Sequence, residues 1–123
     1  MNATTLTLTP EHMASQIADL AADRKALDIV ALDLRGMIGY ADYFVICTGR
    51  SDRQVRAIHD GIHAGMKSEF GLLPGRVEGV TEARWILLDY LDVVVHVFTP
   101  ETREFYRLEQ LWGEAPALAV GAA

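Results

Sequence analysis

The chain has 123 residues, half of them hydrophobic, which suits one domain with its own packed core. Seventeen Asp and Glu residues outnumber eleven Lys and Arg, so the formal net charge is −6. This balance argues against nucleic acid as the main ligand, because phosphate binding depends on Lys and Arg, and it favours a basic protein partner. The single Cys47 excludes an internal disulfide. With neither a signal-peptide pattern nor a membrane-spanning apolar run, we expect a soluble, cytoplasmic protein.

The first predicted elements are a helix followed by two strands. Thr9 and Pro10 supply an N-cap hydroxyl and a proline at the first helical position, which predicts a helix over residues 10–25. The apolar runs 28–34 and 43–48 predict strands. The second run is apolar on both faces, which is typical of a central strand covered on both sides.

A second helix is predicted to begin at a capping box formed by Ser51 and Gln54 and to end near residue 70, before Gly71. Gly61 and Gly65 lie inside this helix, where each costs about 1 kcal/mol relative to Ala. We therefore expect another backbone to approach the helix closely at these two positions.

Three strands and a helix are predicted to follow. The strand patterns occupy 76–80, 84–90 and 93–98, and the last two are separated only by Leu91 and Asp92, the spacing of a tight antiparallel hairpin. The final helix is predicted to begin at Pro100 and to continue at helical spacing through Phe105, Leu108 and Trp112. This order predicts a single α/β domain with a mixed sheet of about five strands and helices packed on it. Residues 114–123 are predicted to form a disordered tail.

Candidate catalytic and metal-binding groups have structural explanations. His59 and His63 have the spacing of two metal ligands, but Asp60 stands where the zinc pattern needs Glu. Cys47 lies inside a strand and is expected to be a core residue. The segment 49–51 lacks the frame of a phosphate-binding loop. We assign no catalytic residue, metal or cofactor.

An enzyme is the alternative interpretation. Asp89 and Asp92 flank the predicted hairpin and could act with Ser51 on a nucleotide and Mg²⁺, as in a nucleotidyltransferase. However, a hairpin turn favours Asp for its own reasons, and no third carboxylate or phosphate-binding Lys has suitable spacing.

The strand around Trp85 carries the clearest sign of a binding surface. Strand alternation places Trp85 and Asp89 on one face, which is unusual for a core. Trp, Tyr and Arg are the residue types that dominate protein interfaces. Glu78 and Asp92 fall in the same stretch, so an interface here would combine an aromatic anchor with acidic groups.

Several motifs resemble the Iojap family of ribosomal silencing factors. They cover residues 8–113, in the family's order, and are the segments 42–51, 54–58, 77–79, 85–90, 92–98 and 105–112. Leu91 departs from the family pattern, which commonly has Gly there, so we expect a hairpin turn other than type I′, the type that needs positive φ at both central residues.

The resemblance implies a fold similar to a nucleotidyltransferase domain without its catalytic carboxylates, and often a homodimer. It also implies binding to a large-subunit ribosomal protein, large-subunit protein fourteen, which blocks joining of the ribosomal subunits and represses translation when nutrients are short. Organellar members assist assembly of the large subunit. A regulator of some other basic protein is a third interpretation.

The expected partner-binding surface combines the acidic residues with aromatic neighbours. Its members are Glu78, Trp85, Asp89, Tyr90, Asp92, His96 and Phe98. Arg50 is a candidate for a minor contact with ribosomal RNA, although a structural role suits it better.

Overall fold

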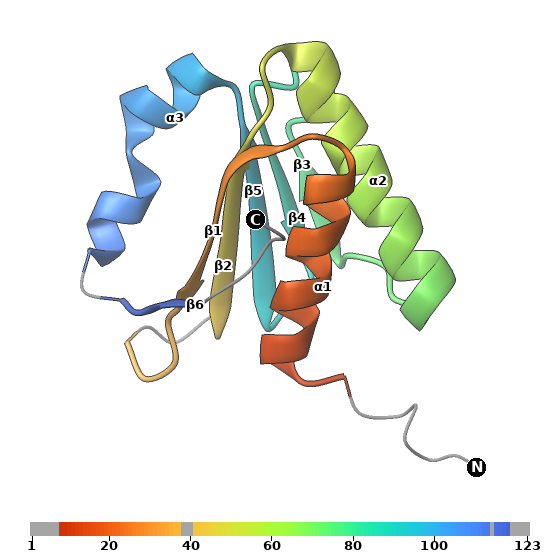
Figure 1. The fold of residues 1–123 in the computed structure, drawn as a ribbon, viewed down its shortest axis with the longest axis vertical. Helices are drawn as coiled ribbons and strands as arrows, with labels where there is room; N and C mark the ends of the chain where they lie inside the picture. Colours follow the sequence, from red (N-terminus) through yellow and green to blue (C-terminus); the bar gives the residue numbers. More distant parts are fainter. Residues whose placement is uncertain (1–7, 38–40, 114, 119–123) are drawn as a thin grey trace.

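The computed structural model describes residues 8–37, 41–113 and 115–118. In chain order, the elements are α1 (Pro10–Asp23), β1 (Leu27–Asp33), β2 (Tyr43–Thr48), α2 (Asp52–Phe70), β3 (Arg76–Glu78), β4 (Trp85–Asp89), β5 (Val93–Phe98), α3 (Pro100–Tyr106), the 3₁₀-helix η2 (Leu108–Trp112) and β6 (Ala117–Leu118) (Figure 1). The predicted α/β class and the order of the first seven elements are confirmed.

The strands form one mixed sheet in the order β3-β4-β5-β2-β1-β6. β2 and β5 run parallel at its centre, and the other neighbouring pairs are antiparallel. The sheet has six strands instead of about five because β6, inside the predicted disordered tail, pairs with β1 through Ala31 and Leu118. Two residues are too few to show a strand pattern in the sequence. The rest of that predicted tail, residues 114 and 119–123, lies outside the described residues.

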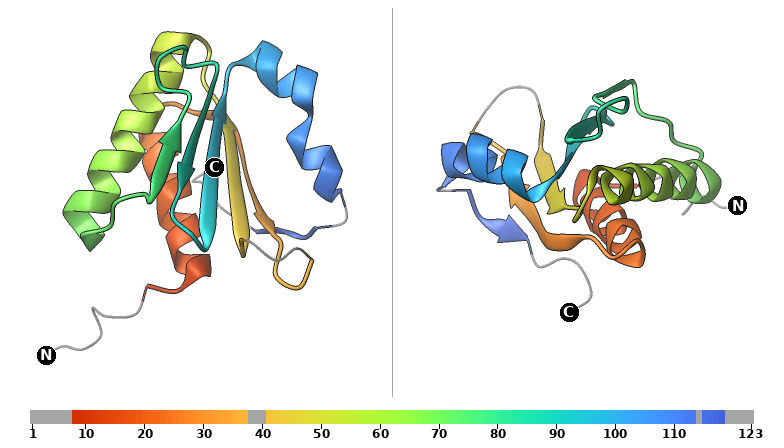
Figure 2. Two further views of the ribbon diagram at one scale, coloured as in Figure 1. Left: turned by 180° about the vertical axis from the view of Figure 1, so that it is seen from behind. Right: turned by 90° about the horizontal axis from the view of Figure 1, so that it is seen from above.

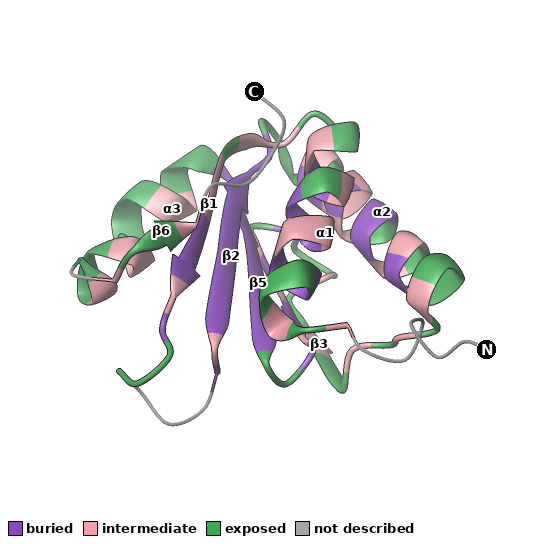
Figure 3. Cartoon of the chain, turned by 60° about the horizontal axis from the view of Figure 1, so that its bottom comes forward, coloured by how far each residue is buried: buried purple, intermediate pink, exposed green. Residues whose placement is uncertain are grey.

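The helices cover the two faces of the sheet unequally. Seen from above, α1 and α2 lie on one face, and α3 with η2 lies on the other (Figure 2). The core under α1 and α2 is the larger and includes Ile17, Ile58, Ile62 and Val95. The opposite core is built around Phe44, Ile46 and Phe98. Every residue of β2 and β5 is buried, as Figure 3 shows in purple, so both faces of these strands must be covered.

Both long helices begin where the sequence predicts, and α2 also ends there, whereas α1 ends at Asp23, two residues before the predicted end. The hydroxyl of Thr9 accepts the amide hydrogen of His12 at 3.1 Å, and that of Ser51 accepts the amide hydrogen of Gln54 at 3.2 Å. α2 ends at Gly71, whose φ of 67° is left-handed. No helix in the described ranges is both long and apolar enough to cross a membrane.

The close approach expected at the glycines of α2 is present, but it is made by two side chains, one from α1 and one from the residue that follows α1, and not by backbone. A Cβ atom on Gly61 would lie 2.7 Å from Cγ of Arg24, and one on Gly65 would lie 2.5 Å from Cδ2 of Leu20. The glycines thus let α1 and α2 pack closely.

The last predicted helix is interrupted. α3 ends at Tyr106 because Arg107 adopts a left-handed φ of 48°, and the chain continues as η2. The helical spacing of Phe105, Leu108 and Trp112 therefore spans two separate elements. This break turns η2 along the sheet face that α1 and α2 leave uncovered.

Gly79 is required where β3 leads toward β4. Its φ is 88°, and a Cβ atom there would lie 2.0 Å from the carbonyl oxygen of Trp85. We predict that Gly79→Ala lowers the free energy of unfolding by about 2–4 kcal/mol, because the new methyl group meets backbone that cannot move aside. Urea denaturation measures this. Gly75→Ala is the control, since a Cβ there meets only ordinary contact at 3.8 Å, and equal losses for the two variants would contradict the prediction.

Candidate functional site

A groove of about 470 Å³ lies between η2 and the sheet face opposite the long helices. The sheet side of the groove is formed by Phe44, Trp85, Leu87, Val94 and His96. Its other side is formed by Leu108, Leu111 and Trp112 of η2. The groove is therefore mainly apolar and aromatic, the usual lining of a site that accepts a side chain or small apolar group.

Trp85 is held in place by its neighbours on β5. Its indole Nε1 donates a hydrogen bond to Nδ1 of His96 at 3.1 Å, and its ring lies 4.9 Å from those of Phe98 and Tyr106. Trp85 remains half-buried, whereas His96 and Phe98 are buried. A rigid, partly exposed indole with its N–H satisfied is well suited to anchor a partner.

His96 is the buried polar group beneath Trp85. Only 4% of its surface is exposed, and burial lowers its pKa to about 4. The imidazole is therefore neutral at pH 7. Because Nδ1 accepts the Trp85 hydrogen bond, the ring proton is on Nε2.

Acidic groups form the rim of the groove at the β4–β5 hairpin. Asp89 accepts the amide hydrogen of Leu91 at 2.8 Å, and its carboxylate lies 3.9 Å from the guanidinium of Arg76. Glu78 also approaches Arg76, at 3.3 Å, and Asp92 is exposed at the hairpin tip. Two of these carboxylates thus share the Arg76 guanidinium, and Asp92 adds a third negative charge at the hairpin tip, which leaves the rim negative.

Leu91 occupies the mouth of the groove in a strained conformation. Its φ is 77°, and 75% of its surface is exposed. The amide of Asp92 donates a hydrogen bond to the carbonyl oxygen of Tyr90 at 3.0 Å, which closes a tight turn around Leu91. Asp92 itself does not have a positive φ. The expectation of a turn other than type I′ is confirmed. A strained leucine held out toward solvent is typical of a functional position.

The structure brings most of the expected surface together. Trp85, His96 and Phe98 are in mutual contact, and Asp89 lies at the end of the same groove. Phe98 is fully buried, so it supports Trp85 and does not reach solvent. The expectation that Tyr90 belongs to this surface is wrong. Its ring packs in the core under α1 and α2, because strand alternation turns it away from Trp85.

Sequence reasoning missed the part of the groove formed by η2. Leu111 and Trp112 line it, and Leu111 is 70% exposed. These residues carried no signal of their own because they were assigned to a continuous helix. The departure of Leu91 from the family pattern predicts only a change of turn type and gives no sign that Leu91 lines a groove.

The residues of the nucleotidyltransferase alternative are not brought together. Ser51 follows the end of β2 that lies beside Phe98, whereas Asp89 pairs with Val94 near the opposite end of the sheet. Among residues 8–37, 41–113 and 115–118, no three His, Cys, Asp or Glu side chains are grouped to hold a metal ion.

The remaining reactive candidates have structural surroundings. Burial raises the pKa of the Cys47 thiol to about 12, so it is not a ready nucleophile. The rings of His59 and His63 lie 5.7 Å apart, and Nδ1 of His59 lies 2.9 Å from the carboxylate of Asp60.

Fold and groove together define an α/β domain with an apolar, acid-rimmed site suited to a protein ligand. Comparison with known families identifies it further. The model of the family "Ribosomal silencing factor during starvation" matches residues 7–122, and the chain belongs to this family. It is thus one of the Iojap-like ribosomal silencing factors, a family named for a regulatory role.

Individual relatives agree with this membership. Ribosomal silencing factor RsfS of Bacillus subtilis is 51% identical over 76% of this chain and 79% of its own length. The chloroplastic protein Iojap of Zea mays is 36% identical over 83% of this chain and 44% of its own. A mouse relative, "Mitochondrial assembly of ribosomal large subunit protein 1", is 33% identical over 78% of this chain and 43% of its own.

The fold is shared with a solved structure. A crystal structure of a Chromobacterium violaceum protein superposes with a TM-score of 0.82 at 34% identity, covering 94% of this chain and 96% of that one. The likeness to a nucleotidyltransferase domain stays a prediction.

His96 makes stability depend on pH in a defined window. In the unfolded state the His96 imidazole is protonated below about pH 6.5, whereas in the folded state it stays neutral down to about pH 4. Stability therefore falls as the pH drops through this window, by about 3 kcal/mol from this residue. We predict that His96→Asn, whose amide oxygen can accept from Trp85, removes this part of the pH dependence in urea denaturation. Equal slopes for the variant and the unmodified protein between pH 6.5 and 4 would contradict it.

Proposed function

We propose that the protein binds the large ribosomal subunit through the groove and its acidic rim, and keeps the small subunit from joining. Its proposed partner there is a basic ribosomal protein of the joining face, and the family resemblance implies large-subunit protein fourteen. The bound domain acts sterically and represses translation when nutrients are limiting. Family membership supports the silencing role, and the groove is the observation that carries the mode of binding.

The chemistry of the groove supports a basic partner with an apolar anchor. Trp85, Leu91 and Leu111 offer apolar surface that water does not solvate well, and burying it drives association. Asp89 and Asp92 add negative charge beside it. On a chain with a net charge of −6, these carboxylates attract a positively charged surface and orient it.

Three further proposals depend on the family resemblance. The protein acts in the cytoplasm, where bacterial ribosomes are found, and it forms a homodimer when not bound to the ribosome. It also contributes to assembly of the large subunit, a role that the name of the mouse mitochondrial relative supports.

The primary test is co-sedimentation with purified large subunits. At low salt the protein is expected in the large-subunit fraction and absent from the small-subunit fraction. Added before small subunits, it is expected to reduce formation of joined ribosomes. Absence from the large-subunit fraction at low salt would refute the proposal, and a saturable stabilisation by ATP or CTP with Mg²⁺ would favour an enzyme instead.

Leu111 separates binding from folding. It is exposed on the groove, so Leu111→Asp should leave the fold intact while placing a charge where the apolar anchor is expected. We predict that this variant weakens binding to large subunits by at least about tenfold, in the range of an interface hot spot. The matched control is Leu73→Asp, since Leu73 is also an exposed leucine, 57% accessible, but lies outside the groove. Equal affinities for the two variants would contradict the prediction.

Asp92 tests the electrostatic part of the proposal. We predict that Asp92→Asn weakens binding about two- to fivefold at low salt, mainly through slower association, and makes the affinity less sensitive to added salt. Surface plasmon resonance over a range of salt concentrations measures both effects. Glu69→Gln removes another exposed carboxylate, from α2, and should change neither. A similar loss of salt sensitivity in both variants would mean that net charge, and not the rim, matters.

A further inference from the structure

The outer side of the groove is a segment with little burial of its own. We call α3 and η2 together, residues 100–112, the wall. Neither helix contains a fully buried residue. On the groove side, Leu108 and Trp112 pack against the core around Phe44 but are themselves only partly buried. An element with so few buried apolar contacts needs another attachment to stay in one place.

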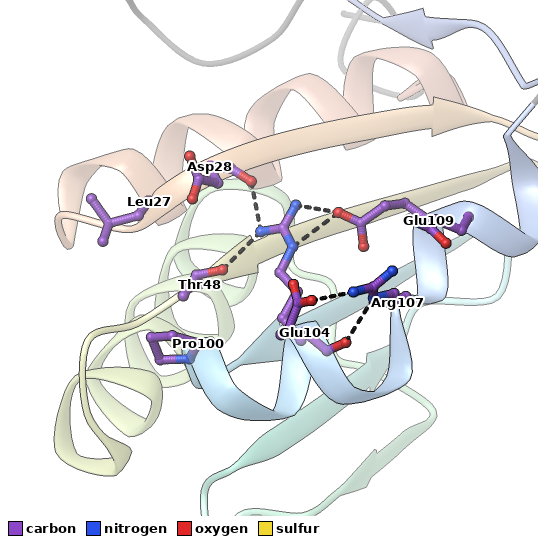
Figure 4. Close-up of a pocket in the computed structure, with 9 residues that line it drawn as sticks. Leu27, Asp28, Thr48, Pro100, Glu104, Arg107 and Glu109 are labelled. Atoms are coloured by element: carbon purple, nitrogen blue, oxygen red, sulfur yellow. Dashed lines mark hydrogen bonds and ion pairs between the residues drawn. The ribbon is translucent and has the colours of Figure 1, made fainter.

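Arg103 of α3 supplies that attachment. One terminal nitrogen, Nη1, donates to the carbonyl oxygen of Asp28 and to the hydroxyl of Thr48, each at 2.8 Å. Nε and Nη2 donate to one carboxylate oxygen of Glu109, at 3.0 and 2.8 Å. The guanidinium thus joins α3 to β1, to β2 and to η2. In Figure 4 these bonds are the dashed lines that end on Asp28, Thr48 and Glu109.

The environment of Arg103 makes these bonds strong. Only 13% of its side chain is exposed, so water competes weakly for its hydrogen-bond donors. It borders a cavity of about 660 Å³ on the side of η2 away from the groove. The two sides of η2 are therefore different: Glu109 faces the Arg103 bonds, and Leu108, Leu111 and Trp112 face the groove.

We propose that Arg103 is a positioning residue for partner binding: it fixes the wall against the sheet and thereby sets the width of the groove. It does so without touching the partner, through Glu109 on η2. This inference rests on the proposed function, since it concerns the same groove. It adds that a residue outside the groove determines affinity.

The planar guanidinium is essential to this role. Its nitrogens reach acceptors on three separate elements from one fixed plane, whereas a lysine ammonium is a single point charge on a flexible stem. Arg103→Lys should therefore keep the charge but loosen the wall. Arg107 offers a matched control, because it borders the same cavity but pairs with Glu104 of α3, the helix that it directly follows, and within the described residues its side chain reaches no strand.

The experiment combines two measurements on Arg103→Lys, Arg107→Lys and the full unmodified chain. Hydrogen exchange followed by mass spectrometry reports how well each segment is held, and titration with purified large subunits reports affinity. For Arg103→Lys we expect faster exchange over residues 108–112 with the central strands still protected, and affinity reduced about tenfold. Arg107→Lys should match the unmodified protein in both. Glu109→Gln keeps the shape of the acceptor but removes its charge, and it should fall between them.

The outcomes distinguish this inference from the proposed function. If Arg103→Lys loosens residues 108–112 but binds large subunits as tightly as the unmodified chain, the positioning role is wrong and the proposed function stands. If exchange rises equally in the central strands, Arg103 is merely structural and the inference is overturned. If the unmodified chain fails to bind, the proposed function and this inference fall together.

Discussion

The two central strands are apolar on both faces of the sheet, but long helices cover only one of these faces. β2 and β5 are buried along their whole length, and α1 with α2 covers one side completely. The other side is covered by the shorter wall, which leaves aromatic and aliphatic side chains partly exposed along its edge. The groove follows from this unequal coverage: burial of the central strands requires a cover, and an incomplete cover leaves apolar surface for a partner.

Charge and backbone strain are concentrated at one end of that groove. Asp89 holds the hairpin by accepting the amide hydrogen of Leu91, and it also contributes to the negative rim. The same hairpin holds Leu91 at positive φ, with its side chain in solvent. An exposed leucine at positive φ does not stabilise the fold, whereas its burial by a partner would stabilise the complex. The hairpin thus links the fold to its proposed use.

Residue patterns predicted the fold better than the site. Caps and apolar runs located α1, α2 and the strands β1, β2, β4 and β5, because these elements bury regular stretches of side chains. β3 is present but ends at Glu78, two residues before the predicted end, and buries little. β6 is too short to produce a pattern, and the left-handed Arg107 broke a helix whose apolar spacing continued across the break. Trp85 stood out because it shares a strand face with Asp89. Which side of η2 faces the groove depends on tertiary packing and cannot be read from the sequence. Strand alternation does indicate that Tyr90 faces away from Trp85, toward the core under α1 and α2.

Photo-crosslinking from the groove mouth tests the central claim most directly. The protein would carry a photoreactive phenylalanine analogue in place of Leu91, and its complex with purified large subunits would be irradiated. The control carries the same analogue in place of Leu73. We expect a crosslink from position 91 to one basic protein of the subunit-joining face, and none to that protein from position 73. Crosslinks to ribosomal RNA alone from position 91, or the same products from both positions, would contradict it.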